Sequence, residues 1–543
     1  MQNEICKKNK SQILNAPRIM IAAPKSGSGK TTLTCAFLQF LKNHGKNPAA
    51  FKCGPDFIDP MFHRQVLGIQ STNLDSFFCS DELLKQIFSE NIKNEESFVV
   101  IEGVMGLFDG LAGASIKASG YDIARITQTP ILLVIDAEGA SRSLVPLIKG
   151  FLDYDKENSN SGENLIKGIF LNKVSKSTCL VLKSLIEEEL KIPVVGFFPK
   201  DPENVLKSRH LGLVLPNEIQ DLQEQIQKSA EVLENSLDFK ALEKIIGDFK
   251  VVSDGVAGKT CEAGFERVSV KAMPEPQSHL TEGVAENTEG ACRPYEHSSS
   301  GDSLKTLLKR FCPTERGRSL RGRLSPTNCS LKIAVAYDEA FCFYYQENLK
   351  LLESFGTKIE YFSPLHDNFI PNGVNGILLG GGYPELYAEQ LESNASMRKS
   401  IKSAVEKGIS VLAECGGFMY LQEKLTTENG RSFEMCGAIK GECRYTGKLV
   451  RFGYAEFKLK KENSGLFSDI IKNPIKGHEF HYFDSTNNGS DFTATKPLSK
   501  KSWDCLIFTE NMLAGFPHLY YPSNPEIVRW FIDSCKNGQN RVK

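Results

Sequence analysis

The chain has 543 residues, of which 41% are hydrophobic and 24% charged, and its formal net charge is −1. This near neutrality argues against a nucleic-acid-binding protein, because phosphate backbones are bound by basic surfaces. No apolar run approaches the roughly 20 residues that span a bilayer, and the first residues lack the apolar core of a signal peptide. The 15 cysteines include no Cys-x-x-Cys pair, which predicts free thiols rather than a metal site. We therefore expect a cytoplasmic protein of two to four domains that binds neither nucleic acid nor membrane.

A phosphate-binding loop stands near the start of the chain, at residues 19–34. A short apolar strand leads into a glycine-rich loop, and a helix is expected to follow over residues 33–43. Gly27 and Gly29 leave backbone N–H groups free for phosphate oxygens, and Lys30 brings a cation to the β- and γ-phosphates. The order of strand, loop and helix predicts a nucleotide triphosphate site.

The two threonines after Lys30 complete this site. The Thr31 hydroxyl can hold Mg²⁺, and Thr32 is expected among the nucleotide contacts. Pro24 stands where the usual motif has its first glycine, so the loop is better read from Lys25. In that form it resembles the loop of the ParA and dethiobiotin synthetase ATPases, and in the ParA branch this early lysine can reach a neighbouring subunit's phosphates. We predict an ATP site and leave the role of Lys25 open.

Acidic residues follow two of the predicted strands. A strand at 49–52 runs into a Pro/Gly-punctuated loop that carries Asp56 and Asp59, and a strand at 98–101 delivers Glu102. Parallel sheets bind ligands at the carboxyl ends of their strands, and a carboxylate there suits an Mg²⁺ ligand opposite the P-loop threonine. For the two aspartates, turn formation is an equally good explanation, because Asp and Pro favour turns.

Three more apolar strands are expected in this domain, at residues 130–136, 168–174 and 192–198. The second of them contains Asn172, which either contacts the nucleotide base or caps the next helix. Arg209 and His210 follow the last strand, and such a pair is usually surface chemistry. The strands together predict a parallel α/β sheet.

Five segments of this domain resemble the cobyrinate a,c-diamide synthase family, namely residues 52–60, 61–63, 73–75, 102–110 and 209–213. These enzymes are corrin-ring amidases of cobalamin biosynthesis and are related to dethiobiotin synthetase. The resemblance implies that ATP and Mg²⁺ are handled by Lys30, Thr31, Asp56 and Glu102. It implies that the tetrapyrrole faces loops 54–63, 73–78 and 105–115, with contacts expected from Lys52, Asp59, Asp75, Arg209 and His210. It also implies a homodimer.

The segment 251–330 breaks the pattern of apolar periodicity and is rich in Gly, Glu, Ser, Pro and Thr. Such a composition cannot bury enough apolar surface to offset the entropy of ordering, so we expect a disordered insert. Its basic stretch at 305–323 has no aromatic platform, which favours a solvated linker over a nucleic-acid or membrane patch. The expected domains are thus 17–250, the insert 251–330, and 331–537.

The last domain begins with strands expected at 331–337, 358–362 and 376–379. The third strand ends in Gly380, Gly381 and Gly382, whose backbone amides could form an oxyanion hole or only a tight turn. A strand at 409–413 then leads to Cys415, which two glycines follow. This arrangement is typical of a nucleophile elbow, in which the strand end exposes Sγ and the helix dipole favours the thiolate.

A cysteine nucleophile needs a base, and three histidines lie downstream. His518 stands just before the final helix and is favoured, with His478 and His481 as the alternatives. The domain resembles the class I glutamine amidotransferases, in which a late histidine pairs with the cysteine and a glutamate stands two residues beyond it. Here that place holds Tyr520, so a Cys–His dyad rather than a triad is implied.

The combined prediction is an α/β protein in which a P-loop synthetase domain is fused to a flavodoxin-like class I glutamine amidotransferase domain. We expect a carbon–nitrogen ligase that uses ATP, Mg²⁺ and L-glutamine to amidate the a and c acetates of cobyrinate through an acyl phosphate. Hydrogenobyrinate or nickel-sirohydrochlorin could replace cobyrinate, because these rings carry similar side chains. The alternative from another class is a ParA-like ATPase switch, which the amidotransferase features argue against.

Overall fold

The computed structural model describes residues 16–92, 97–159, 162–200, 216–246, 331–460 and 471–541. The predicted disordered insert at 251–330 lies outside the described residues, and so do Arg209 and His210. The expected domain limits therefore stay a prediction. The described residues form an N-terminal half, 16–246, built on a parallel sheet, and a C-terminal half, 331–541, built on a mainly parallel sheet.

One seven-stranded parallel sheet organises the N-terminal half, in the strand order β3-β2-β4-β1-β5-β6-β7. Its strands are β1 (Arg18–Ala22), β2 (Pro48–Cys53), β3 (Ser71–Leu74), β4 (Phe98–Glu102), β5 (Ile131–Asp136), β6 (Ile166–Asn172) and β7 (Val194–Phe197). The apolar strands are buried along almost their whole length, as in sheets that are covered on both faces. Because β4 and β5 flank β1, the carboxyl ends of all three strands meet at one edge, beside the P-loop.

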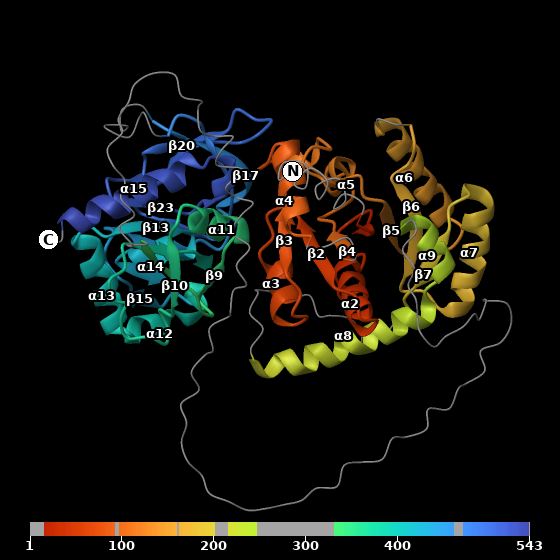
Figure 1. The fold of residues 1–543 in the computed structure, drawn as a ribbon, viewed down its shortest axis with the longest axis horizontal. Coiled ribbons are helices and arrows are strands. Elements are labelled where there is room, and N and C mark those ends of the chain that lie inside the picture. The colour runs from red at the N-terminus through yellow and green to blue at the C-terminus, as the bar shows by residue number, and fades with distance from the viewer. Residues whose placement is uncertain are drawn as a thin grey trace, which may run out of the picture. The chain divides into compact units, whose positions relative to one another are not determined.

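Helices pack around this sheet (Figure 1). They are α2 (Lys30–Asn43), α3 (Ile58–Gln65), α4 (Asp81–Glu90), α5 (Gly120–Thr127), α6 (Leu144–Asn158), α7 (Lys176–Leu190), α8 (Pro216–Ser236) and α9 (Phe239–Ile246), with the short η1 (Leu111–Gly113). Helix α2 starts directly at the P-loop lysine and packs against α8. The expected strands and the P-loop helix are thus confirmed, and among the strands that the structure describes in this half, β3 was not predicted. Three of its four residues are polar, so it carries no apolar run.

The C-terminal half contains a six-stranded sheet in the order β10-β8-β11-β13-β23-β22, parallel except for β22. Its strands are β8 (Lys332–Ala336), β10 (Lys358–Phe362), β11 (Gly376–Leu379), β13 (Ser410–Glu414), β22 (Ile507–Phe508) and β23 (Met512–Gly515). The four strands expected from the sequence all belong to this sheet. Its helices are α11 (Gln346–Ser354), α12 (Ala388–Ser393), α13 (Ala395–Glu406), α14 (Gly416–Leu421) and α15 (Glu526–Arg541), with η2 (Pro384–Tyr387) and η5 (Tyr521–Ser523).

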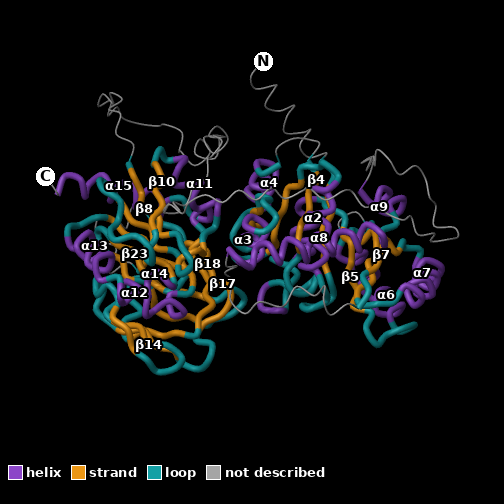
Figure 2. The backbone as a smooth tube through the Cα atoms, turned by 90° about the horizontal axis from the view of Figure 1, so that it is seen from below, coloured by secondary structure: helices purple, strands orange, loops and turns teal. Residues whose placement is uncertain are grey.

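Smaller sheets complete this half, and the sequence did not predict them (Figure 2). One has the order β15-β14-β16-β19, with β14 (Lys424–Thr426), β15 (Ser432–Glu434), β16 (Glu442–Tyr445) and β19 (Phe483–Ser485). Another has the order β21-β20-β17-β18-β24, with β17 (Arg451–Leu459), β18 (Ile475–His481), β20 (Phe492–Thr495), β21 (Ser502–Cys505) and β24 (His518–Leu519). The short β9 (Phe341–Phe343) pairs with β12 (Gly381–Gly382). The fold is therefore α/β, with a mixed sheet and an antiparallel sheet added in the C-terminal half.

Each main sheet has its own cluster of buried apolar side chains. The cluster around the N-terminal sheet also contains Tyr345 and Tyr520 of the C-terminal half, so the two halves share part of this core. In the part of the chain that the structure describes, no helix combines the length and apolarity needed to cross a bilayer.

Candidate active sites

The P-loop is braced from the neighbouring strand β6. Gly29 is the residue before α2 and has φ 97°, in the left-handed region that favours glycine. A Cβ at this position would collide with the side-chain amide of Asn172, whose Nδ2 donates to the Ser28 carbonyl at 2.8 Å. Helix α7 is capped instead by Ser175, so the helix-capping alternative for Asn172 is wrong. Its contact with a nucleotide base stays a prediction.

Lys30 points toward the loop that follows β4. Its Nζ donates to the carbonyls of Met105 at 2.6 Å and Lys25 at 3.1 Å. Burial, together with the neighbouring charge of Lys52, lowers the pKa of Lys30 to about 8. The side chain of Lys25 is exposed, and its role stays open.

Glu102 lies at the centre of the predicted metal site. Its Oε1 accepts hydrogen bonds from Thr31 Oγ1 at 2.6 Å and from Lys52 Nζ at 2.9 Å. Its Oε2 is buried and has no hydrogen-bond partner among the described residues. Burial raises the pKa of this carboxyl group to about 7, because a charged form is disfavoured away from water.

These oxygens fit Mg²⁺, which is usually bound by one or two protein ligands together with phosphate oxygens and water. Thr31 and Glu102 supply such ligands. Glu102 Oε2, which accepts no hydrogen bond among the described residues and lies 3.7 Å from His63 Nε2, is able to coordinate the cation. No group of three or more His, Cys, Asp or Glu side chains within the described ranges has the geometry of a complete metal cage. The site is thus suited to a cation that arrives with a nucleotide.

Lys52 connects Glu102 to the two aspartates of the next loop. Its Nζ lies 2.5 Å from Asp59 Oδ2 and 3.7 Å from Asp56 Oδ2. Asp56 Oδ1 also accepts from the backbone N–H of Ile58 at 2.8 Å, so this residue does form the turn that the sequence left as one alternative. Burial raises the pKa of Asp56 to about 6. Lys52 is 4% exposed, and the substrate contacts expected from it and from Asp59 stay predictions.

Asp75 is buried where the two halves meet. Its Oδ1 accepts from the backbone N–H of Phe77 at 2.8 Å, and its Oδ2 accepts from Tyr454 Oη at 2.7 Å. Lys476 of the C-terminal half donates to the Phe77 carbonyl at 2.7 Å. Asp75 thus forms a hydrogen bond between the two halves, and the substrate contact expected from it stays a prediction.

Cys415 occupies a strained turn between β13 and α14. Its φ of 47° and ψ of −105° are sparsely populated by residues other than glycine, and its N–H donates to the Gly515 carbonyl at 2.8 Å. This is the expected nucleophile elbow. The expected preference for the thiolate is not seen: burial, followed by the charge of Glu385, raises the pKa of the thiol, while a hydrogen bond from the Gly416 N–H lowers it less.

The glycine segment after β11 lies between Cys415 and His518. The Gly380 N–H donates to Tyr344 Oη at 2.8 Å, so this amide is already engaged and is not a free oxyanion donor. A Cβ at Gly381 would collide with Cε1 of His518. The Gly382 nitrogen lies beside Gly416, the residue after the nucleophile. A Cβ added at Gly416 would be only 3.1 Å from that nitrogen.

His518 stacks on another of the candidate histidines. The imidazoles of His518 and His478 face each other across the β18–β24 pair, with ring centres 4.9 Å apart and an angle of 16°. Burial lowers the pKa of both rings, that of His478 to about 3. His478 Nδ1 lies 3.0 Å from Tyr345 Oη, whereas His481 stacks on Phe516. This places the favoured base at the glycine segment and gives His478 a supporting position.

Phe57 connects the two candidate sites. It follows Asp56 in sequence, and its ring centre lies 5.2 Å from that of His518 and 5.1 Å from that of Phe343, on which it stacks. No motif in the sequence marks this residue as functional. A single phenylalanine between two aspartates carries no signal of a partner hundreds of residues away.

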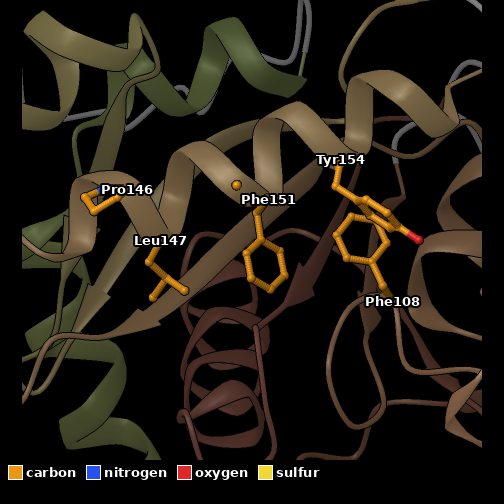
Figure 3. A pocket seen from close by; sticks show the side chains of 6 residues that line it. Phe108, Pro146, Leu147, Phe151 and Tyr154 are labelled. Carbon is orange, nitrogen blue, oxygen red and sulfur yellow. The ribbon is translucent and has the colours of Figure 1, made fainter.

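A shallow hollow of about 370 Å³ lies elsewhere on the N-terminal half (Figure 3). Phe151 and Tyr154 of α6 and Phe108 of the loop after β4 line it, with Pro146, Leu147 and Gly150. The Phe108 and Tyr154 rings meet nearly edge to face, 4.8 Å apart. None of the predicted ATP-site residues lines this hollow, so we assign no part of that site to it.

Comparisons with known proteins also divide the chain into a nucleotide-binding part and a glutamine amidotransferase part. Residues 19–213 match the family described as "CobQ/CobB/MinD/ParA nucleotide binding domain", and residues 332–525 match the "CobB/CobQ-like glutamine amidotransferase domain". The chain is 35% identical to a cobyrinate a,c-diamide synthase of Caldanaerobacter subterraneus, over 95% of this chain and 98% of that protein. Enzymes of the same name from Clostridium tetani and Listeria innocua are 33% and 34% identical, over 95% and 94% of this chain and 99% and 98% of theirs.

Proposed function

Because the chain belongs to the cobyrinate a,c-diamide synthase family, we propose that it amidates the a and c acetate carboxylates of cobyrinate in cobalamin biosynthesis, with ATP and L-glutamine as co-substrates. The observation that carries this proposal is the presence of two sites in one chain. A P-loop faces a buried carboxylate network, and a strained cysteine lies with a buried histidine around one glycine segment.

The proposed glutaminase step begins at Cys415. Its Sγ attacks the side-chain amide carbon of glutamine, and His518 takes the thiol proton and returns it to the departing ammonia. We propose that the N–H groups of Gly382 and Gly416 donate to the oxyanion of the tetrahedral intermediate. Water then hydrolyses the thioester and releases glutamate. Gly416 was not predicted from the sequence, although the residue after a nucleophile is a common oxyanion donor.

The proposed synthetase step takes place at the P-loop. A ring carboxylate attacks the γ-phosphorus of ATP, ADP leaves, and an acyl phosphate forms. Lys30 stabilises the charge on the transferring phosphoryl group, and the P-loop N–H groups bind the phosphates. Mg²⁺ held by Thr31 and Glu102, with Asp56 as a further predicted ligand, would neutralise phosphate charge when bound. Ammonia then attacks the acyl carbon and phosphate leaves, and a second round gives the diamide.

The contacts between the halves support an internal route for ammonia. Phe57 lies against His518 on one side and directly follows Asp56 on the other. The resemblance to the family implies that ammonia travels internally, and we propose that it passes the Phe57 ring on its way from His518 to the carboxylate network. A homodimer remains part of the proposal only through the resemblance to the family.

The decisive experiment incubates the purified chain with ATP, Mg²⁺ and glutamine and with each of three rings, cobyrinate, hydrogenobyrinate and nickel-sirohydrochlorin. We expect mass spectrometry to show two amidations of cobyrinate, with ADP and glutamate formed in step with them. Preferred amidation of another ring would correct the substrate. ATP hydrolysis that is stimulated by DNA and needs no tetrapyrrole would instead favour a ParA-like switch.

A further inference from the structure

The imidazole of His518 is not fixed by a hydrogen bond at Nδ1, which is buried without a partner among the described residues. The position two residues later holds Tyr520, whose ring stacks on Phe78 at 5.0 Å. The imidazole is packed against His478, Phe57 and Gly381, and none of these contacts is a hydrogen bond. The position of the ring therefore depends on how the backbone around His518 is anchored.

Glu414 anchors that backbone. It is the last residue of β13, directly before Cys415, and it is 8% exposed. Its Oε1 accepts a hydrogen bond from Tyr521 Oη at 2.9 Å, and its carboxyl group also accepts from the backbone N–H of Leu519. The Glu414 side chain, on the strand that leads to the nucleophile, thus binds both Leu519 and Tyr521.

A second anchor holds the same segment from another element. Asn348 of α11 donates to the Leu519 carbonyl at 2.8 Å and accepts from the Tyr521 N–H at 2.9 Å. Asn348 fixes the segment relative to α11, whereas Glu414 fixes it relative to Cys415. Only the latter connection bears directly on the distance between nucleophile and base.

We propose that Glu414 is a positioning residue of the glutaminase, which fastens segment 518–521 to the strand that ends at Cys415 and so sets the separation of the base and the nucleophile. This inference rests on the proposed roles of Cys415 and His518. Tyr520 stands where class I amidotransferases have a glutamate, and it offers no carboxylate to the histidine. Glu414 orients His518 instead, through the backbone of segment 518–521.

The electrostatics of the site agree with a role through hydrogen bonds rather than through charge. Burial raises the pKa of Glu414 to about 8, so at neutral pH the carboxyl group is mostly uncharged. A neutral group does not oppose formation of the thiolate on the adjacent cysteine. Glutamine, which is also neutral and offers an acceptor oxygen, is therefore a close substitute for Glu414.

The test compares glutamine hydrolysis by Glu414→Ala, Glu414→Gln and Tyr521→Phe in the full-length enzyme, with ATP and cobyrinate present. For Glu414→Ala we expect kcat to fall roughly 10- to 100-fold, because a displacement near 1 Å costs about 10²-fold. KM for glutamine should not change, since Glu414 does not touch the substrate. Glu414→Gln should keep kcat within about threefold, and Tyr521→Phe, which loses one hydrogen bond, should lower it about 3- to 10-fold.

Amidation driven by free ammonium should be unchanged in all three variants, because it bypasses the glutaminase. Glu347→Gln is the matched control: Glu347 is a buried carboxyl group of the same half whose oxygens have no hydrogen-bond partner among the described residues. It should leave kcat unchanged.

A kcat within twofold of the parent in Glu414→Ala, or an equal loss of ammonium-driven activity, would overturn the positioning role. If Glu414→Ala does not fold, an unchanged kcat in Tyr521→Phe overturns it just as well. Failure of the proposed function gives a different result, namely glutamine-dependent activity that survives Cys415→Ser.

Discussion

The ATP site and the glutaminase site differ in the charge of their buried polar groups. In the N-terminal half, burial alone would lower the pKa of Lys52, but Glu102 and Asp59 raise it overall, so the lysine keeps its charge inside a network of carboxylates. In the C-terminal half, burial lowers the pKa of His518 and raises that of the Cys415 thiol, so both groups are neutral.

The difference matches what each site has to bind. Phosphates and Mg²⁺ are charged. When they bind, the lysine and the carboxylates of the network can form contacts with them in place of contacts with one another. The amide of glutamine is neutral, and a neutral thiol and imidazole avoid the cost of burying an ion pair before the substrate arrives. Charge then develops only during the proton transfer between Cys415 and His518.

The largest expected effect comes from removing the cation of the first network. Lys52→Met leaves the carboxylates of Glu102 and Asp59 without their shared partner, which should lower the free energy of unfolding by about 3–5 kcal/mol. Activity should fall with glutamine and with ammonium alike, because the ATP site serves both. Urea unfolding and the amidation assay measure these effects. Lys85→Met, which removes an exposed lysine of α4, is the control, and equal stability of the two variants would contradict the account.

Gly381→Ala tests the packing of the second site. The added methyl group would collide with Cε1 of His518 and displace the imidazole, so we expect glutamine-dependent kcat to fall about 10²-fold. Ammonium-dependent amidation should stay at the parent level. Gly150→Ala, at a helical position where a Cβ meets nothing within 4 Å, is the control. A normal glutamine-dependent rate in Gly381→Ala would show that His518 is not the base.

A further effect, absent at neutral pH, concerns the pH dependence of stability. Burial holds the pKa of His478 at about 3, whereas in the unfolded chain it would have its ordinary value of about 6.5. The unfolded state therefore binds more protons between these values, so the stability that the neutral ring contributes is complete above pH 6.5 and is lost as the pH falls toward 3.

His478→Asn removes this titration but keeps a polar partner for Tyr345. The difference in unfolding free energy between parent and variant should be constant above pH 7. Below pH 6.5 it should shift by up to about 1.4 kcal/mol per pH unit, in favour of the variant. Denaturant titrations at several pH values check this, and a difference that does not vary with pH would show that His478 is not buried in its neutral form.

The sequence predicted the features that depend on local patterns, but not those that depend on distant parts of the chain. The P-loop, the apolar parallel strands and the turn at Cys415 are local patterns, and the structure confirms each as a structural element. The polar strand β3 and the sheets that contain β14 and β17 were missed, because their residues become strands only through their neighbours in the fold.

The supporting residues were missed for a related reason. Glu414 and Phe57 act through partners that lie about a hundred residues away or more, so no motif reveals them. The engaged amide of Gly380 likewise depends on the hydroxyl of Tyr344, which a run of three glycines does not indicate.

The most direct test of two cooperating sites is the nitrogen source of Cys415→Ser. This variant should lose glutamine-dependent amidation of cobyrinate by at least about 10³-fold while it keeps ATP- and ammonium-dependent amidation at the parent rate. Substantial glutamine-dependent activity would contradict the assignment of the nucleophile. A parallel loss of the ammonium-dependent reaction would contradict the division of the chemistry between the P-loop and the cysteine.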